Sequence, residues 1–297
     1  MQAPLGGRSQ GQSGTHRGIL RGDRGAGAPG LRRRVHHASL LLNDILLVEH
    51  RGDRLQVTIN RPERRNALSL ELLDRLGATF TRYAADPTLK CAVLTAAGDR
   101  CFAAGGDLRE LAAVRSEADT LAMSRRARAA LAAVRCFPVP VLAALNGHAL
   151  GGGAELALAC DLRVATPQTE IGFLQAQLNV TTAWGGGIDL LALLGPARGL
   201  ALLLEARRLP AAQALQLGLL ERVCGPGESL AACTDSFLAP LLERPVQVLR
   251  AYKALALAAR RALHDRLAAV EEGGFTTTWT HPDHWSAAEL ALGPKPG

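Results

Sequence analysis

The sequence predicts an α/β fold. Short apolar runs typical of strands, such as residues 55–59 and 92–96, alternate along the chain with longer segments of helical periodicity. Two further observations agree: glycine clusters at 105–106 and 151–153 follow strand-like runs, and each cluster opens a helical segment. The length of 297 residues suffices for one large or two modest domains with a buried core.

The first ordered elements are two strands joined by a tight turn. Residues 45–49 and 55–59 flank Gly52-Asp53, a pattern that predicts a β-hairpin. Ser69 is a suitable N-cap for the helix that follows. The apolar positions of this helix have helical spacing and are Leu72, Leu73, Leu76, Phe80 and Tyr83.

Further strands and helices alternate from there to the C-terminus. The apolar runs predict strands at 92–96, 139–144 and 162–165. Helical periodicity predicts helices opening at Asp107 and spanning 117–135, 155–160, 191–205, 209–220 and 245–270. We therefore expect a core at 44–205 and a C-terminal helical region at 206–297.

Residues 1–43 form a basic leader with a different composition. They hold seven Arg and one Asp, so most of the net charge of +7 belongs to them and the rest of the chain is nearly neutral. We expect this Gly-, Arg-, Ser- and Gln-rich leader to be disordered. It resembles a mitochondrial transit peptide in being Arg-rich and acid-poor, but its glycines oppose an amphipathic helix, and a flexible extension or a misplaced start codon is the simpler interpretation.

Composition argues against several classes of function. The charge lies in the leader, so nucleic-acid binding is not expected. No uninterrupted apolar span of about 20 residues occurs, and we predict no membrane helix. The six cysteines are scattered without Cys-x-x-Cys or paired His spacing, which favours buried free thiols in a reducing compartment and no metal site.

The glycine cluster within residues 146–155 is the strongest candidate for a site. Glycines at a helix start leave backbone N–H groups without intrahelical partners and let a ligand approach closely. Such donors suit an anion, or an oxygen that becomes negative during a reaction. Glu155 follows Gly152 by about one helical turn, so its carboxylate is expected to reach the same pocket. A purely structural turn is the alternative for this cluster alone.

A second glycine turn, within residues 101–111, follows the strand predicted at 92–96. Its Gly105-Gly106 pair precedes the helix that opens at Asp107 and offers another backbone donor. Two such donors on one carbonyl oxygen form an oxyanion hole, in which each contributes roughly 3–4 kcal/mol to the stability of a transition state. Gly106 and Gly152 are the predicted donors.

Three motifs in this order and spacing resemble the enoyl-CoA hydratase/isomerase (crotonase) superfamily. They are Arg-Pro with Asn-Ala-Leu at 61–68, Phe-Ala-Ala-Gly-Gly-Asp-Leu at 102–108, and the glycine cluster with Glu155 and Cys160-Asp161 at 146–161. The likeness extends from about residue 44 to 291. It implies a crotonase fold, a spiral of repeated ββα units with C-terminal helices that cover the active site and mediate trimers.

The resemblance also implies how coenzyme A binds. The loop with Arg61, Arg64 and Arg65 would border the adenine and phosphates, and arginine suits phosphate, although a solvated charged loop has the same composition. The other coenzyme-binding positions expected from the motifs are Ala67, Ala104, Asp107 and Leu108. Coenzyme A would enter as a thioester substrate, with no cofactor held permanently. The tail around Leu292–Lys295 matches the family's usual coenzyme-contacting end poorly, and we expect no contacts there.

Position 175 departs from the hydratase pattern. Hydratases of the superfamily carry a second glutamate there, and this chain has Gln175. An amide exchanges no proton near neutral pH, so Gln175 can orient water or the thioester but cannot be an acid or base. This change, Trp184 before Gly185, and the Phe275-x-x-x-Trp279 tail resemble the methylmalonyl/ethylmalonyl-CoA decarboxylase branch. Core packing is an equal alternative for Trp184.

The sequence therefore predicts an acyl-CoA enzyme, with Gly106 and Gly152 as oxyanion donors, Glu155 as the acid-base group and Gln175 as an orienting neighbour. Enoyl-CoA hydration or isomerisation is the expected reaction, and malonyl-type decarboxylation is the alternative within the family. A subunit that binds acyl-CoA or assembles without turnover is the alternative from another class. We expect a homotrimer or dimer of trimers in the cytoplasm, or in the mitochondrial matrix if the leader is a transit peptide.

Overall fold

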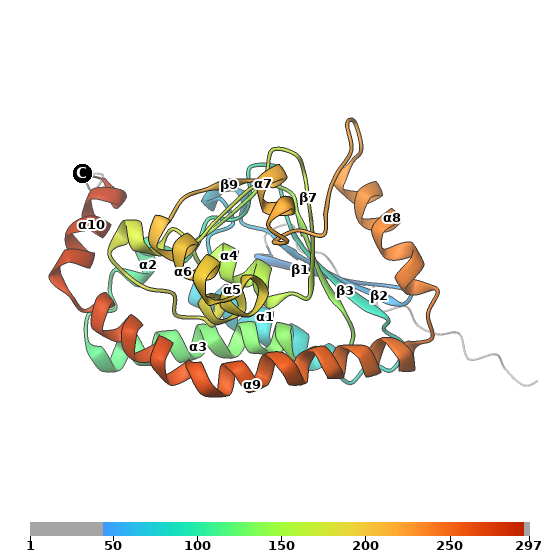
Figure 1. Cartoon of the computed structure of the whole chain (residues 1–297), viewed down its shortest axis with the longest axis horizontal. Helices are drawn as coiled ribbons and strands as arrows, with labels where there is room; N and C mark the ends of the chain where they lie inside the picture. The colour runs from blue at the N-terminus through green and yellow to red at the C-terminus, as the bar shows by residue number, and fades with distance from the viewer. Residues whose placement is uncertain (1–43, 294–297) are drawn as a thin grey trace, which may run out of the picture. The chain divides into compact units, whose positions relative to one another are not determined.

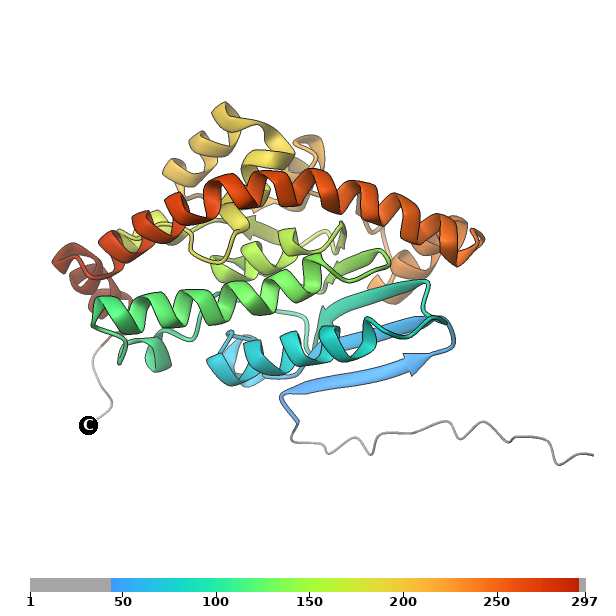
Figure 2. The same ribbon diagram turned by 90° about the horizontal axis from the view of Figure 1, so that it is seen from below.

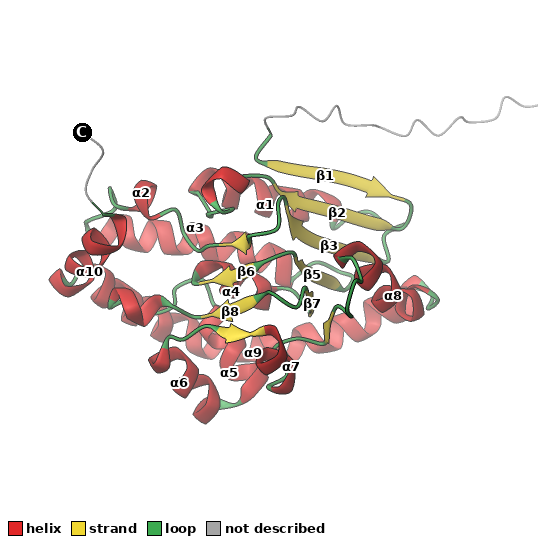
Figure 3. Cartoon of the chain, turned by 90° about the horizontal axis from the view of Figure 1, so that it is seen from above, coloured by secondary structure: helices red, strands yellow, loops and turns green. Residues whose placement is uncertain are grey.

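The computed structural model describes residues 44–293, so the leader predicted at 1–43 lies outside them. Two sheets form the core, and Figure 3 shows both of them with the helices around them. The larger has the strand order β1 (Leu46–Arg51), β2 (Arg54–Ile59), β3 (Cys91–Ala96), β5 (Val141–Leu145), β7 (Leu162–Ala165) and β10 (Arg222–Val223). The smaller has the order β4 (Cys101–Ala103), β6 (His148–Leu150), β8 (Glu170–Gly172) and β9 (Leu209–Pro210).

The strands follow the expected ββα repeat. β3 and β4, then β5 and β6, then β7 and β8 each place one strand in the larger sheet and the next in the smaller. A helical segment follows the two strands of each repeat. Strands of successive repeats pair in parallel, β3 with β5 and β5 with β7 in the larger sheet, and β4 with β6 and β6 with β8 in the smaller. Because both faces of a parallel sheet are covered, β5 is buried along its whole length and reads as a continuous apolar run. The crotonase spiral is confirmed.

The helices lie around this core, as Figure 1 shows. Their bounds are α1 Leu70–Tyr83, α2 Leu108–Leu111, α3 Glu117–Arg135, α4 Gly152–Ala159, α5 Gly186–Leu194, α6 Pro196–Glu205, α7 Ala211–Gln216, α8 Leu230–Leu242, α9 Val246–Trp279 and α10 Pro282–Leu292. There are also two short 3-10 helices among the described residues, η1 (Pro62–Arg64) and η2 (Gln175–Leu178). No helix within 44–293 is long and apolar enough to cross a membrane.

The helix α1 forms as its sequence predicts. The Ser69 hydroxyl accepts the N–H of Leu72 at 3.2 Å and caps the helix. Leu72, Leu76 and Phe80 are fully buried on its inner face. The Phe80 ring meets Phe137 edge-on at 5.2 Å, a favourable geometry for aromatic pairs, so this face anchors α1 to the end of α3.

The helices predicted for the C-terminal half differ from the structure in three places, and α8 and α10 were not predicted. The helix predicted at 191–205 is two helices, α5 and α6, because Gly195 adopts a φ of +78° and Pro196 cannot continue the preceding helix. The segment 209–220 holds only β9 and the short α7. The helix predicted at 245–270 continues to Trp279, and Figure 2 shows this long α9 running beside α3. Tertiary packing against α3 sustains it through Gly273-Gly274.

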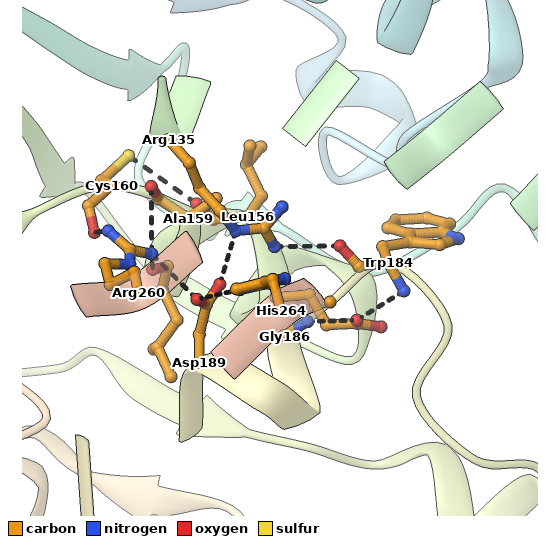
Figure 4. A network of polar contacts seen from close by, with 12 residues as sticks. Arg135, Leu156, Ala159, Cys160, Trp184, Gly186, Asp189, Arg260 and His264 are labelled. Atoms are coloured by element: carbon orange, nitrogen blue, oxygen red, sulfur yellow. Dashed lines mark hydrogen bonds and ion pairs between the residues drawn. The ribbon is translucent and has the colours of Figure 1, made fainter. Parts of the chain in front are cut away.

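A buried cluster of charges joins α3, α5 and α9. The Asp189 carboxylate accepts from Arg135 at 2.7 Å, from Arg260 at 3.0 Å, and lies 2.8 Å from His264 Nε2 (Figure 4). Burial alone would raise the pKa of Asp189, but the charges of Arg135 and Arg260 and the His264 hydrogen bond outweigh it and hold that pKa well below its ordinary range. Arg135 also donates to the Trp184 carbonyl at 2.9 Å, so the cluster fixes the loop before α5.

Asp189→Asn is expected to lower the free energy of unfolding by about 3–5 kcal/mol, because it leaves Arg135 and Arg260 buried without their counter-charge. Equilibrium denaturation measures the loss. The aspartate's stabilisation is fully present above its unfolded pKa of about 3.9 and is lost progressively as pH falls from there through the lower pKa of the folded state, so the two proteins should converge on strong acidification. The exposed Asp235→Asn is the control and should change little. A loss at neutral pH no larger than the control's would contradict this account.

Candidate active site

One cavity of about 290 Å³ brings together the four catalytic residues predicted from the sequence. Gly106 and Gly152 line it from the starts of α2 and α4, Glu155 from the first turn of α4, and Gln175 from the start of η2. Three segments that are distant in sequence thus meet where β4, β6 and β8 of the smaller sheet end.

The two glycine turns lie against each other. Gly105 has a φ of +110° and Gly151 a φ of +54°, and both conformations favour glycine. A Cβ on Gly105 would stand 3.6 Å from the amide nitrogen of Gly152. Within residues 44–293, neither Gly106 nor Gly152 donates its N–H to a protein acceptor. The cavity is therefore lined by two glycines with free backbone donors, as an oxyanion hole requires.

The indole of Trp184 forms a wall beside both glycines. A Cβ on Gly152 would stand 2.2 Å from the Trp184 ring, and one on Gly106 would stand 3.4 Å from it. Trp184 is 5 % exposed and lines the cavity. Trp184 is therefore a core residue, as one of the two sequence-based interpretations expects, and it is also a wall of the cavity. Any side chain at position 152 would disturb this packing as well as the donor.

Glu155 is held by three hydrogen bonds. Its Oε2 accepts the N–H groups of Trp184 and Gly186, each at 2.9 Å, and its Oε1 accepts Gln175 Nε2 at 2.9 Å. Gly186 is obligatory there, because a Cβ at that position would stand 2.3 Å from the Glu155 side chain. Only 2 % of Glu155 is exposed.

The surroundings of Glu155 suit proton transfer near neutral pH. Burial raises the pKa of Glu155 to about 7, and the nearby negative charge of Glu271 acts in the same direction. The hydrogen bonds from Gly186, Trp184 and Gln175 favour the carboxylate and limit the rise. A carboxyl group in this range exists in both protonation states at neutral pH, which is the property of an efficient acid-base catalyst.

Glu271 is a second buried carboxylate that the sequence analysis missed. It comes from α9 and accepts the Gly185 N–H at 2.9 Å, the Thr182 hydroxyl at 2.8 Å and Arg128 at 2.8 Å. It does not line the cavity. Its contacts fix the backbone of the same loop whose N–H groups hold Glu155. Nothing in the helical pattern of α9 distinguishes Glu271 from a surface residue.

Apolar side chains form the rest of the cavity. They come from α2, α3, η2 and α9, and include Leu111, Met123, Leu178, Val180, Phe275 and Trp279. The Phe275-x-x-x-Trp279 spacing was the only sequence signal for the two from α9, which extends past its predicted end. Such a lining suits an acyl chain next to a few polar groups.

An adjoining cavity of about 320 Å³ collects most of the predicted coenzyme-binding residues. Its lining includes Arg64, Arg65, Ala67, Ala104, Asp107 and Leu108. Ala104, Leu108 and Arg65 also line the first cavity, so the two share a border. Leu292, from the tail for which no coenzyme contact was expected, lies in the same lining, while residues 294–297 are outside the described part.

Arg61 stands apart from this group. Its guanidinium donates to the Ala67 carbonyl and to the Asp107 carboxylate at 3.1 Å, and it lines neither cavity. The pair is mostly buried and joins the loop after β2 to the start of α2. Arg208, which the sequence analysis did not single out, lines the first cavity from the strand end at β9 and lies 3.4 Å from Glu170. Within residues 44–293 no His, Cys, Asp and Glu cluster could hold a metal ion.

Comparisons with known proteins identify the family of this chain. The family model for enoyl-CoA hydratase/isomerase matches residues 52–285. The chain is 33 % identical over 190 residues to a short-chain-enoyl-CoA hydratase of Clostridium acetobutylicum, covering 63 % of this chain and 71 % of that protein. It is 31 % identical over 255 residues to an ethylmalonyl-CoA decarboxylase of Danio rerio, covering 84 % of this chain and 82 % of that protein.

A solved structure shows the same fold. The crystal structure of an enoyl-CoA hydratase from Mycobacterium avium subsp. paratuberculosis superposes with a TM-score of 0.73 at 27 % identity, covering 82 % of this chain and 97 % of that one. Sequence motifs, ββα spiral and site geometry all agree with the family match. The chain belongs to the enoyl-CoA hydratase/isomerase family.

Proposed function

We propose that this protein transforms an acyl-CoA thioester by forming an enolate at Gly106 and Gly152. The thioester oxygen would accept both N–H groups, each of which stabilises the developing negative charge by roughly 3–4 kcal/mol. Glu155 would move the proton. The observation that carries this proposal is a buried carboxyl with a pKa of about 7 in the same cavity as two unused backbone donors.

The reaction that we assign is enoyl-CoA isomerisation or hydration. Isomerisation needs a single group that removes a proton from one carbon and returns it to another. Among residues 44–293, Glu155 is the one carboxylate in the lining of the cavity. Hydration would require Glu155 to activate water and then to protonate the α-carbon. Gln175 would orient the water or the thioester, because its amide cannot exchange a proton near neutral pH.

Coenzyme A would occupy the adjoining cavity. Arg64 and Arg65 are exposed at its rim and are suited to the phosphates. Ala67, Ala104 and Leu108 would contact the remaining coenzyme. Arg61 and Asp107, through their ion pair, would hold the loop in shape rather than bind phosphate themselves.

Decarboxylation of a malonyl-type thioester is the second candidate. It needs the oxyanion hole and one proton donor, not two carboxylates, and Gln175 is therefore compatible with it. The match to the Danio rerio protein, named an ethylmalonyl-CoA decarboxylase, also extends over most of this chain.

Self-association and location complete the proposal. Exposed apolar side chains on α6 and α9 suit a subunit interface of a homotrimer or a dimer of trimers; they are Leu200, Leu204, Leu255 and Val270. The six free cysteines, five of them buried, are compatible with the cytoplasm. The matrix of mitochondria is the alternative location.

Mass spectrometry of crotonyl-CoA and methylmalonyl-CoA after incubation with the protein separates the candidates. Addition of water to crotonyl-CoA supports hydration, and loss of carbon dioxide from methylmalonyl-CoA supports decarboxylation. A 3-enoyl-CoA tests isomerisation. Its 2-enoyl product has the same mass as the substrate, so the two are separated by chromatography. Binding of all three without any product would favour a binding-only protein and contradict catalysis.

Glu155→Gln is expected to lower kcat by roughly 10²–10⁴-fold, because it removes the only group that transfers the proton. The fold should persist, since a glutamine oxygen can still accept the Trp184 and Gly186 N–H groups. Steady-state kinetics and thermal denaturation measure the two effects. Glu117→Gln, at an exposed position of α3, is the matched control. Wild-type kcat in the Glu155 variant would contradict its role.

The pH profile of kcat/KM should reveal which form of Glu155 is active. For isomerisation or hydration the carboxylate is the active form, so the rate should rise about tenfold per pH unit up to about pH 7 and then level. For decarboxylation the protonated form quenches the enolate, and the rate should fall above about pH 7. A flat profile between pH 6 and 8 would contradict both assignments of Glu155.

A further inference from the structure

The hydrogen bonds of Glu155 restrict where its proton can be. Both in-plane sites of Oε2 are used by the N–H groups of Trp184 and Gly186, and a backbone N–H cannot become an acceptor. A proton on Glu155 must therefore be on Oε1, the oxygen that faces Gln175. The partner of the proton-carrying oxygen is a side-chain amide, which can donate through Nε2 or accept through Oε1.

Gln175 has an unused polar atom beside this contact. While Nε2 donates to Glu155, the Gln175 Oε1 is buried and has no hydrogen-bond partner within residues 44–293. Both residues line the cavity. Reversing the amide would let Oε1 accept a proton from Glu155 and would place Nε2 where the unused oxygen now lies. The atom at the position of the unused oxygen would change from acceptor to donor.

We propose that the Gln175 amide reverses when Glu155 takes up a proton, so that a ligand carrying a carboxylate beside its thioester is bound together with a proton. The inference rests on the proposed acyl-CoA function and names the substrate class that fits the protonated site. A carboxylate in the cavity would repel the Glu155 carboxylate and favour its protonated form. The reversed Gln175 then donates a hydrogen bond to the ligand's carboxylate. An unreversed amide would present its oxygen, which cannot donate to a carboxylate.

The device also supplies the proton for decarboxylation. The bond between the α-carbon and the ligand's carboxylate breaks, carbon dioxide leaves, and the electron pair remains as an enolate held by Gly106 and Gly152. The proton on Glu155 Oε1 passes to the α-carbon, leaving the acyl-CoA product and the Glu155 carboxylate. One proton taken up from solvent per turnover balances the reaction.

The other charges around Glu155 are paired and do not replace this response. Glu271 on α9 is bound by Arg128 of α3. Arg135 is bound by Asp189 of α5, with His264 of α9 on the same carboxylate. None of these groups lines the cavity.

Two cations border the cavity itself. Arg208 lies 3.4 Å from Glu170, and Arg65 is exposed at the border with the adjoining cavity. Arg65 lines both cavities and would attract any acyl-CoA through its phosphates. Arg208 lines only the first cavity and would add to the attraction for a ligand's carboxylate whatever the state of Gln175. Proton uptake, and the part of the binding that is lost with the Gln175 amide, depend on Glu155 and Gln175.

Calorimetric titration tests the proposal with two unreactive ligands. One is the malonyl-CoA analogue with nitrogen in place of the thioester sulfur, since an amide forms an enolate far less readily. The other has a methyl group in place of its carboxylate. Titrations at pH 7 in two buffers of different ionisation enthalpy give the protons exchanged, and mass spectrometry checks that both ligands survive.

The carboxylated analogue should take up a measurable fraction of a proton near pH 7, because free Glu155 with a pKa of about 7 is partly ionised there, and the methyl analogue should take up almost none. Glu155→Gln should abolish the uptake. Gln175→Met should weaken binding of the carboxylated analogue by about tenfold or more and leave the methyl analogue nearly unchanged. Gln216→Met, at an exposed position of α7, is the matched control.

Equal proton uptake with the two analogues, or equal weakening of both by Gln175→Met, would overturn the inference while leaving acyl-CoA binding intact. Failure of both analogues to bind the wild-type protein would contradict the acyl-CoA function and the inference with it. The two failures are therefore distinguishable.

Discussion

The site depends on the hydrogen bonds from the Trp184 and Gly186 N–H groups to Glu155. They stabilise a carboxylate in a largely apolar cavity, where burying an unpaired ion would cost several kcal/mol of solvation free energy. Two backbone donors and one side-chain amide reduce this cost. They leave the negative charge of Glu155 in place, whereas an arginine would neutralise it. The balance leaves a pKa of about 7, between those of a solvated and an isolated buried carboxyl.

The loop that supplies these donors is held from several sides. Glu271 of α9 accepts the Gly185 N–H between the two residues that hold Glu155. Arg135 of α3 binds the Trp184 carbonyl and the Asp189 carboxylate, and Figure 4 shows this link from Trp184 to the charged cluster. The indole of Trp184 in turn packs beside Gly106 and Gly152. The stability of the helical layer and the geometry of the proposed oxyanion hole are thus coupled through one loop.

Local signals made much of this fold predictable. The Ser69 cap, the apolar face of α1 and the strand–glycine–helix order around Gly106 and Gly152 are all contained in short stretches of sequence. The very short strands β4, β6 and β8 were missed, because three residues are too few to show alternation. The end of α9 was missed as well, since its continuation through two glycines depends on packing against α3 rather than on propensity.

The site residues that belong to a sequence motif were predictable. Those that reach the site from distant parts of the chain were not. Gly106, Gly152, Glu155 and Gln175 line one cavity as expected. Glu271 and Arg208 carry no local mark, because their roles arise only when α9 and β9 reach the site. Arg61 shows the converse: its sequence neighbourhood favours a phosphate site, yet the fold places Asp107 within 3.1 Å of its guanidinium.

The most direct test of this account is the titration of Glu155 itself. Carbon-13 NMR of protein labelled at the glutamate carboxyls follows each group between pH 4 and 9, and comparison with Glu155→Gln assigns the resonance. The account predicts one carboxyl that titrates near pH 7 and is missing from the variant. If the resonance lost in the variant titrates below pH 5 with the exposed glutamates, Glu155 is an ordinary carboxylate and cannot be the acid-base group that the account requires.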